Sequence, residues 1–171
     1  MSCSAWSIDW CGIRWPLTAR ARPLPERPKV PPDLRARVRL RAQIRCEYCH
    51  ASEEWQYVEF TMEHIVPVAA GGKTIAENLA LCCFSCNRRK WDRRTGLDPA
   101  AGSEHRLFNP REDAWNEHFV WTSDGLSIVG QTAVGRATVA ALDLNRERVR
   151  QIRAADAALG RHPPPEDRRL S

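Results

Sequence analysis

Apolar and polar side chains alternate along residues 58–65, which is typical of a strand with one buried face. Pro67 and the glycine pair at 71–72 end or bend a returning strand, and Asn78 precedes a short apolar run. Residues 87–91 are then rich in helix-forming side chains. The pattern therefore predicts two strands, a loop and a helix, in this order.

Further elements are predicted on both sides of this segment. Two prolines and Asp33 begin a helix that runs to about Arg45, with apolar residues at four-residue spacing on one face. Residues 119–122 and 126–129 flank a Ser-Asp-Gly turn, which is a hairpin signal. These elements indicate that helices and short strands continue beyond the central segment.

Two more helices are predicted towards the end of the chain. Thr132 caps a helix that runs through Leu142. Asn145 begins another, and Gly160 ends it. The apolar side of this last helix is expected to consist of Val149, Ile152 and Leu159. The mixture of helices and short strands predicts an α+β fold.

The chain has 171 residues, which suits one compact domain. We expect this domain to span residues 31–160, with its core at residues 46–91. Residues 1–30 contain several prolines and arginines and are predicted to form a disordered or extended leader. Residues 161–171 are predicted to be a flexible tail.

Charge and hydropathy restrict the possible partners only in part. The formal net charge is +5 and the pI about 9.0, but acidic residues offset many of the basic ones. The arginines of the first predicted helix could face water or follow a nucleic-acid backbone, and both interpretations stay open. No apolar run is long enough for a membrane span, and polar residues interrupt the segment where a signal peptide would need apolar ones. We expect a cytoplasmic protein without a membrane partner.

Two Cys-x-x-Cys pairs bracket the central segment: Cys46 with Cys49, and Cys83 with Cys86. Two thiolates from each pair would complete the tetrahedral sulfur site that structural zinc prefers. The pairs lie further apart than in short zinc motifs, so a folded segment must fill the interval. Redox dithiols usually accompany a βαβ pattern, and seven cysteines cannot all form disulfides. We therefore predict a structural Zn²⁺ ion.

The remaining cysteines are not needed for this site. Cys82 could replace Cys83 in a wider spacing, but Cys83 keeps the tighter pair, so we expect Cys82 to be a small core residue. Cys3 and Cys11 belong to no close pair and are expected to be unpaired thiols.

Other side chains have two possible roles. His50 follows a predicted zinc ligand and is expected to be exposed, with a hydrogen bond to the zinc site as the alternative. The aromatic-rich segment at residues 115–121 could stack on bases, but core packing is commoner for large side chains. We expect core positions for Trp115, His118, Phe119 and Trp121.

Between the cysteine pairs, the phrases EHIVP, GG-x₅-NL and C-x-x-C-N-x-x-K contain Glu63, His64, Asn78 and Asn87 in order. In these phrases the chain resembles the HNH endonuclease family, which has an acidic residue and a histidine, then an asparagine, then a histidine or asparagine. The resemblance implies a ββα-metal, treble-clef-like nuclease core with an N-terminal helix and a C-terminal β-hairpin plus helices. The later phrases LFNPR, W-x-x-HF and GRATV-x-AL-x-LNR look like the continuation found in compact bacterial HNH proteins.

The resemblance also implies a function, the metal-dependent hydrolysis of phosphodiester bonds in DNA. His64 would be the general base, because an imidazole with a pKa of about 6.5 is largely neutral at cellular pH. Asn78 would orient either the imidazole or the loop through its amide.

The same resemblance implies sites for a cation and for the phosphate backbone. Glu63 and Asn87 would hold a catalytic divalent cation, Mg²⁺ or another, through one carboxylate and one neutral oxygen. Arg88, Arg89 and Lys90 follow on the same predicted helix and would contact phosphates or stabilise developing charge.

DNA is the expected partner, with RNA as an alternative, and the protein could act as a monomer or a homodimer. A second interpretation is a catalytically inactive, zinc-stabilised nucleic-acid-binding module. The intact set of four family residues argues against it, because a pure binder needs no base beside a metal ligand. A third interpretation, a zinc-organised protein-interaction domain, predicts no salt-dependent DNA binding.

Overall fold

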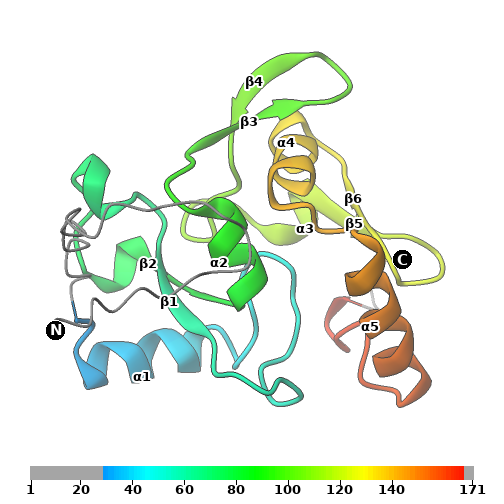
Figure 1. Ribbon diagram of the computed structural model, residues 1–171, viewed down its shortest axis with the longest axis horizontal. Helices are drawn as coiled ribbons and strands as arrows, with labels where there is room; N and C mark the ends of the chain where they lie inside the picture. The colour runs from blue at the N-terminus through cyan, green and yellow to red at the C-terminus, as the bar shows by residue number, and fades with distance from the viewer. Residues whose placement is uncertain (1–28, 168–171) are drawn as a thin grey trace, which may run out of the picture.

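The computed structural model describes residues 29–167, which form helices and small antiparallel sheets (Figure 1). Each sheet of this part of the chain has two strands. The α+β class predicted from the sequence is confirmed. No helix within residues 29–167 is long and apolar enough to cross a membrane. Most of the predicted leader, including Cys3 and Cys11, lies outside the described residues.

The central hairpin pairs β1 (Thr61–His64) with β2 (Leu79–Cys82) in antiparallel register. Thr61 faces Cys82 and His64 faces Leu79, so His64 lies at the loop end of the hairpin. All four residues of β2 are buried. β1 is shorter than the strand predicted from residue 58, because residues 57–59 lie exposed on the surface and only the later positions pair with β2.

The two strands are joined by a loop with two 3₁₀ turns, η1 (Val68–Ala70) and η2 (Ala76–Asn78). The predicted order of two strands followed by a loop is therefore wrong, because the loop comes before the second strand. Pro67 precedes η1 with a φ of −58°, and Gly71 ends it with a φ of 84°, a left-handed conformation that favours glycine.

Helices α1 (Pro32–Arg41) and α2 (Phe84–Lys90) lie on opposite sides of the β1–β2 hairpin (Figure 1). α1 buries an apolar edge formed by Leu34 and Val38. It ends four residues before the predicted Arg45, because residues 43 and 44 have φ angles of 50° and 57° that no helix can accommodate.

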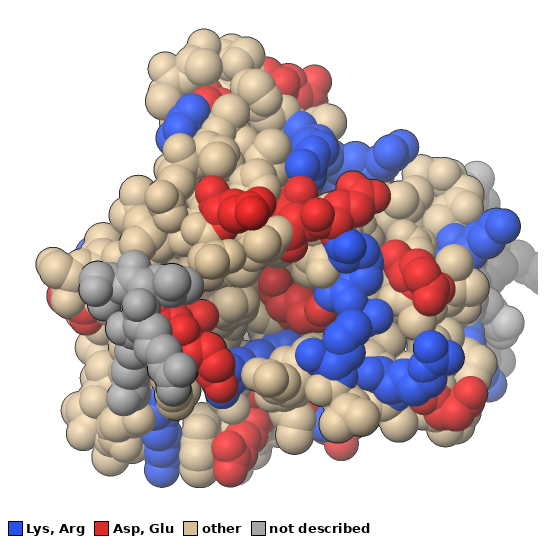
Figure 2. Space-filling view, turned by 180° about the vertical axis from the view of Figure 1, so that it is seen from behind, with Lys and Arg blue, Asp and Glu red and all other residues tan. Residues whose placement is uncertain are grey.

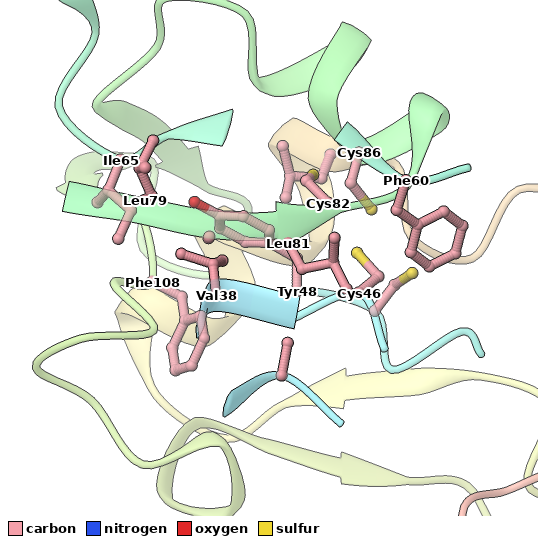
Figure 3. Close-up of a cluster of buried hydrophobic side chains, with 14 of the residues drawn as sticks. Val38, Cys46, Tyr48, Phe60, Ile65, Leu79, Leu81, Cys82, Cys86 and Phe108 are labelled. Atoms are coloured by element: carbon pink, nitrogen blue, oxygen red, sulfur yellow. The ribbon is translucent and has the colours of Figure 1, made fainter. Parts of the chain in front are cut away.

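Figure 3 shows the hydrophobic core around this hairpin, with α1 on one side and α2 on the other. Tyr48, Leu79 and Leu81 have no exposed surface, and Phe108 reaches them from the C-terminal half of the chain. Phe119 and Trp121 belong to the same cluster, and Trp115 packs against it. The predicted core role is confirmed for Phe119 and Trp121, whereas Trp115 and His118 are only partly buried.

Several arginines in and after α1 bind residues that are distant in the sequence. Arg39 forms a salt bridge of 2.6 Å with the buried Glu53, and Arg41 donates to two backbone carbonyls near β2 at 2.9 and 2.7 Å. Arg45 pairs with Glu166 from the far end of the described chain. The sequence suggested either water or nucleic acid as the partner of these arginines, and for these three the partner is the protein itself.

The C-terminal half contains two further hairpins and three helices. Their bounds are β3 (Thr95–Asp98), β4 (Ser103–Arg106), α3 (Trp115–His118), β5 (Phe119–Trp121), β6 (Ile128–Gly130), α4 (Ala133–Leu142) and α5 (Glu147–Ala158). The β5–β6 hairpin and the cap of α4 confirm the prediction, since the Thr132 hydroxyl accepts from the Gly135 amide at 3.0 Å. The β3–β4 hairpin has no counterpart among the elements predicted from the sequence. It is mostly exposed and is held against α4, where Arg136 binds Asp98 at 2.9 and 2.7 Å.

The apolar side predicted for α5 is wrong. Ile152 and Leu159 are 44% and 63% exposed, whereas Arg153 is only 5% exposed. The guanidinium of Arg153 lies 4.9 Å from the centre of the Trp121 ring and donates to the Leu126 carbonyl at 2.9 Å. A stacked, hydrogen-bonded guanidinium can therefore occupy the buried position that the pattern assigned to apolar residues.

Residues 161–167, which we predicted to begin a flexible tail, pack against the fold. The Asp167 carboxylate accepts hydrogen bonds from His50 at 2.8 Å and from the Trp121 indole at 3.0 Å. His50, predicted to be exposed, is half-buried and stacks on Trp115 with ring centres 4.3 Å apart. The end of the described chain is thus bonded to the segment that carries the first cysteine pair.

Candidate active site and zinc-binding cysteines

The four predicted zinc ligands lie together. The sulfur atoms of Cys46, Cys49, Cys83 and Cys86 are all within 4.8 Å of one another, and those of Cys49 and Cys83 are 3.8 Å apart. A tetrahedral zinc ion with Zn–S bonds of about 2.3 Å requires sulfur separations of roughly 3.8 Å. The set therefore fits a Zn(Cys)₄ site, and the cysteine prediction is confirmed to this extent.

Local structure brings the two pairs together. Cys83 caps α2, because its sulfur accepts from the Cys86 amide at 3.4 Å, so the second pair is part of a helix start. The first pair is tied to β2, since the Glu47 amide donates to the Leu81 carbonyl at 2.9 Å. Cys82 is fully buried within the core cluster, as expected for a small core residue.

The cysteine thiols also shift one another's pKa values. Burial would raise the pKa of Cys46, but hydrogen bonds from the neighbouring thiols outweigh it and lower that pKa well below the ordinary value. The hydrogen bonds with Cys46 have the opposite effect on Cys83 and Cys86, whose pKa values are raised well above the ordinary value of a thiol. A cluster in which several buried thiols compete for protons is favourable for a metal ion that replaces those protons.

His64 lies at the end of β1 and is half-buried. Its Nε2 atom is 2.9 Å from the hydroxyl of Thr74 in the loop between the strands. Burial and the nearby positive charge of Lys90 both lower the pKa of the imidazole. His64 is therefore mainly neutral at neutral pH, which is the state that can accept a proton. Nothing in the sequence motif marked Thr74 as its partner.

Asn78 acts on the loop and not directly on the imidazole. Its Oδ1 accepts from the Val66 amide at 2.8 Å, and its Nδ2 donates to the carbonyls of Val66 and Lys73, both at 3.0 Å. Gly72 lies against this junction, where a Cβ atom would be 1.8 Å from the Val66 oxygen. The loop that carries Thr74 is thus held at both ends, which fixes the hydroxyl relative to His64.

Residues 46–93 match the HNH endonuclease family model. This HNH region contains both cysteine pairs, the central hairpin and α2, and the recognition made from the sequence is confirmed for these residues. A comparison with curated proteins found no match for the chain.

Glu63 of the HNH region is buried, and its carboxylate is paired with the Lys90 ammonium. Its Oε1 atom is 2.6 Å from the Lys90 ammonium, and its Oε2 atom accepts from the Tyr48 hydroxyl at 2.9 Å. Burial raises the pKa of Glu63, although Lys90 and Tyr48 oppose that shift. The carboxylate predicted to bind a divalent cation therefore already has a cation beside it.

Lys90 is only 1% exposed, which differs from the predicted contact with phosphates. Its ammonium group has three N–H donors. The Nζ atom is 2.6 Å from the Glu63 carboxylate, 3.0 Å from the Ile65 carbonyl oxygen and 3.4 Å from the His64 carbonyl oxygen. All its donors therefore have partners inside the protein. Lys90 supports the backbone at the end of β1, where His64 is attached.

The other predicted residues of α2 in the HNH region are more accessible. The Nδ2 atom of Asn87 donates to the Thr61 hydroxyl at 2.9 Å. Its Oδ1 atom takes no part in this hydrogen bond. Arg88 is exposed, and Arg89 forms a salt bridge of 3.0 Å with Asp143. Of the three basic residues predicted to contact phosphates, only Arg88 is exposed.

Replacing Lys90 by methionine is expected to lower the free energy of unfolding by about 3–5 kcal/mol, because the Glu63 carboxylate would stay buried without a counter-charge. Urea denaturation measures this change. Arg88→Met is the matched control on the same helix, and an exposed position should change stability by less than about 0.5 kcal/mol. Adding Glu63→Gln to Lys90→Met should recover much of the loss. Equal stability of the two single variants would contradict the role assigned to the buried pair.

Proposed function

We propose that this protein is a metal-dependent endonuclease that hydrolyses phosphodiester bonds in DNA, with His64 as the general base. The observation that supports this most is the environment of His64: a half-buried, mainly neutral imidazole at the end of β1, within a region that matches the HNH family model. Hydrolysis needs a base for the attacking water on a rigid support, and this histidine has both properties.

Thr74 suggests which ring nitrogen takes the proton. We assign the hydrogen of neutral His64 to Nε2, which then donates to the Thr74 hydroxyl 2.9 Å away. Nδ1 carries the lone pair in this tautomer and would take the proton from the attacking water. Asn78 would contribute by fixing the loop that carries Thr74.

The proposal includes a divalent cation held by Glu63 and Asn87, which would supply positive charge beside the scissile phosphate. The Oδ1 atom of Asn87 suits such a cation as a neutral ligand. Glu63 suits it less, because Lys90 lies 2.6 Å from the carboxylate and a second cation there would be repelled. Binding at Glu63 would require the Lys90 ammonium to move away, so we expect weaker binding than at an unpaired carboxylate.

The side of the molecule shown in Figure 2 supports local phosphate contacts and not one broad basic face. On the side of the molecule in Figure 2, Lys and Arg side chains gather in a band, with Asp and Glu side chains among them. Arg88 is exposed, directly follows Asn87 in α2, and is our proposed phosphate contact. DNA binding through a small number of such contacts should weaken with salt.

A supercoiled-plasmid assay tests the proposal. Zinc-loaded protein should convert the plasmid to nicked or linear DNA with 5′-phosphate ends when Mg²⁺ is present, and should not when Mg²⁺ is left out. Omitting Mg²⁺ is preferable to adding excess chelator, because a chelator would also extract structural zinc. Absence of cleavage with every divalent cation tried would refute the catalytic assignment.

One observation favours the alternative of a binding module without catalysis. The Glu63–Lys90 pair is neutral as a unit, so the folded site needs no added cation for its stability. Salt-dependent DNA binding without any cleavage would support this alternative. Absence of both binding and cleavage would favour a zinc-organised protein-interaction domain.

A further inference from the structure

A groove of about 720 Å³ lies between the zinc-binding cysteines and helix α5. We call it the knuckle groove. The first side is formed by residues near the cysteine pairs and the second by α5 and the segment before it. Its most informative lining residues are Trp55, Tyr57 and Phe84 on the first side and Arg146, Arg153 and Arg161 on the second or at its end.

The first side exposes aromatic rings to solvent. Tyr57 is fully exposed, and Phe84 and Trp55 are 64% and 45% exposed. The guanidinium of Arg161 already covers the Trp55 ring at 3.8 Å from its centre. Large apolar side chains grouped around a groove, and not scattered singly over the surface, indicate a binding site.

The second side contains a buried cation with an unused donor. Arg153 is 5% exposed, and its Nη1 donates to the Leu126 carbonyl at 2.9 Å and to the Asn145 side chain at 3.2 Å. Its Nη2 atom is buried and has no hydrogen-bond partner among the described residues. A charged donor without a partner is costly inside a protein, and an anionic oxygen would satisfy it.

The charges around the groove are close to balanced, because a zinc ion on four thiolates would add a net charge of about −2. The unsatisfied Nη2 of Arg153, and not the net charge, therefore favours an anion there. Four arginines and two acidic residues line it, and one of those arginines, Arg45, pairs with Glu166. Burial lowers the pKa of Arg153, and the nearby thiols of Cys49 and Cys86 oppose this shift only in part. No thiol among the described residues accepts a hydrogen bond from Nη2. A ligand with a flat ring and an acidic group would match both sides of the groove.

We propose that the knuckle groove binds an unpaired nucleotide of a nucleic-acid strand, with its base against Tyr57 and Phe84 and its phosphate towards Arg153. The choice of a nucleotide rests on the function proposed above. Aromatic side chains beside arginines are the usual surface for single-stranded nucleic acid. Phe60 and Cys83, which line the groove, flank the end of the hairpin opposite His64, about 10 Å away along β1. One strand could therefore reach both places.

Binding of a fluorescently labelled oligothymidine tests this inference, with zinc-loaded full-length protein and Mg²⁺ left out so that no cleavage occurs. Tyr57→Ala and Phe84→Ala should each weaken binding roughly tenfold, because each removes a stacking surface. Both side chains are exposed, so neither change should affect folding. Leu40→Ala, at an exposed apolar position on α1 outside the groove, is the matched control and should change nothing.

Comparison ligands separate nucleotide binding from simpler attractions. A duplex of the same length should be affected much less by Tyr57→Ala, because its bases are already stacked. Inorganic phosphate should compete less well than thymidine monophosphate. Unchanged oligothymidine affinity in both variants, equal loss for the duplex, or equal competition by phosphate would each overturn the inference.

The outcome does not depend on the cleavage assay. If the wild-type protein cuts plasmid DNA but Tyr57→Ala and Phe84→Ala bind oligothymidine normally, the proposed function stands and the groove inference fails. If the wild-type protein does not cut but these variants lose binding, the inference stands for a binding module.

Discussion

Replacing His64 by alanine is expected to reduce DNA cleavage by a factor of about 100 to 10,000, because the variant lacks the group proposed to take the proton from water. The side chain is only half-buried, and among residues 29–167 its one side-chain hydrogen bond is to Thr74, so the fold and the zinc content should be retained. Plasmid cleavage, circular dichroism and zinc stoichiometry on the same preparation measure the three properties.

His105→Ala is the matched control for this change. His105 is also partly exposed and bonded to a hydroxyl, that of Ser103 at 3.0 Å, but it lies on β4, outside the HNH region. It should cleave like the wild-type protein. Normal cleavage by pure His64→Ala protein would refute the assignment, and equal loss in both variants would indicate a general effect on the protein.

The pH dependence of wild-type cleavage adds a second readout for His64. Burial and Lys90 lower its pKa, so the neutral base persists to lower pH than in a free histidine. The kcat/KM for cleavage should therefore be level near neutrality and should fall at lower pH, with its midpoint below the value of about 6.5 for free histidine. Any residual cleavage by His64→Ala should not show this decrease at low pH.

Loss of zinc is expected to have the largest effect on stability. Structural zinc contributes about 10–16 kcal/mol in small zinc domains, which is comparable to the whole stability of a typical domain, about 5–15 kcal/mol. Cys46 and Cys86 are almost fully buried within the main core, so the zinc site and the core should unfold together. Cys83→Ala should therefore fail to retain zinc and should lose its cooperative thermal transition.

Cys82→Ala is the control, because it changes the neighbouring cysteine, which is buried but is not part of the four-sulfur cluster. It should keep one zinc ion per chain and lose only a small part of the stability. Zinc stoichiometry and thermal melting distinguish the two variants. Retention of zinc and a normal melting temperature in Cys83→Ala would contradict the ligand set.

Short-range signals in the sequence predicted the parts of the fold that depend on neighbouring residues. The Ser-Asp-Gly turn gave the β5–β6 hairpin, and Thr132 was correctly identified as the cap of α4. The spacing of the cysteine pairs predicted a cluster that the structure contains. In each case a residue type suits one local geometry and few others, so the pattern alone was sufficient.

The sequence did not predict the positions of long cationic side chains. Lys90 was predicted to contact phosphates and Arg153 was not among the predicted buried residues, since charged residues are usually exposed, but both are buried by partners distant in sequence. Their partners are Glu63 and the carbonyl of Leu126, 27 residues away in both cases. A pairing over such a distance depends on tertiary structure and has no signature in a local pattern.

The bonds of Asp167 have a practical consequence for protein engineering. Its carboxylate joins His50, next to the Cys49 ligand, to the indole of Trp121, and the preceding Glu166 pairs with Arg45. A truncation that shortens the chain from this side should therefore leave residues 161–167 in place. An affinity tag or fusion partner attached directly after Asp167 would disturb its bond to His50, which follows the first cysteine pair. A spacer should therefore separate the tag from Asp167.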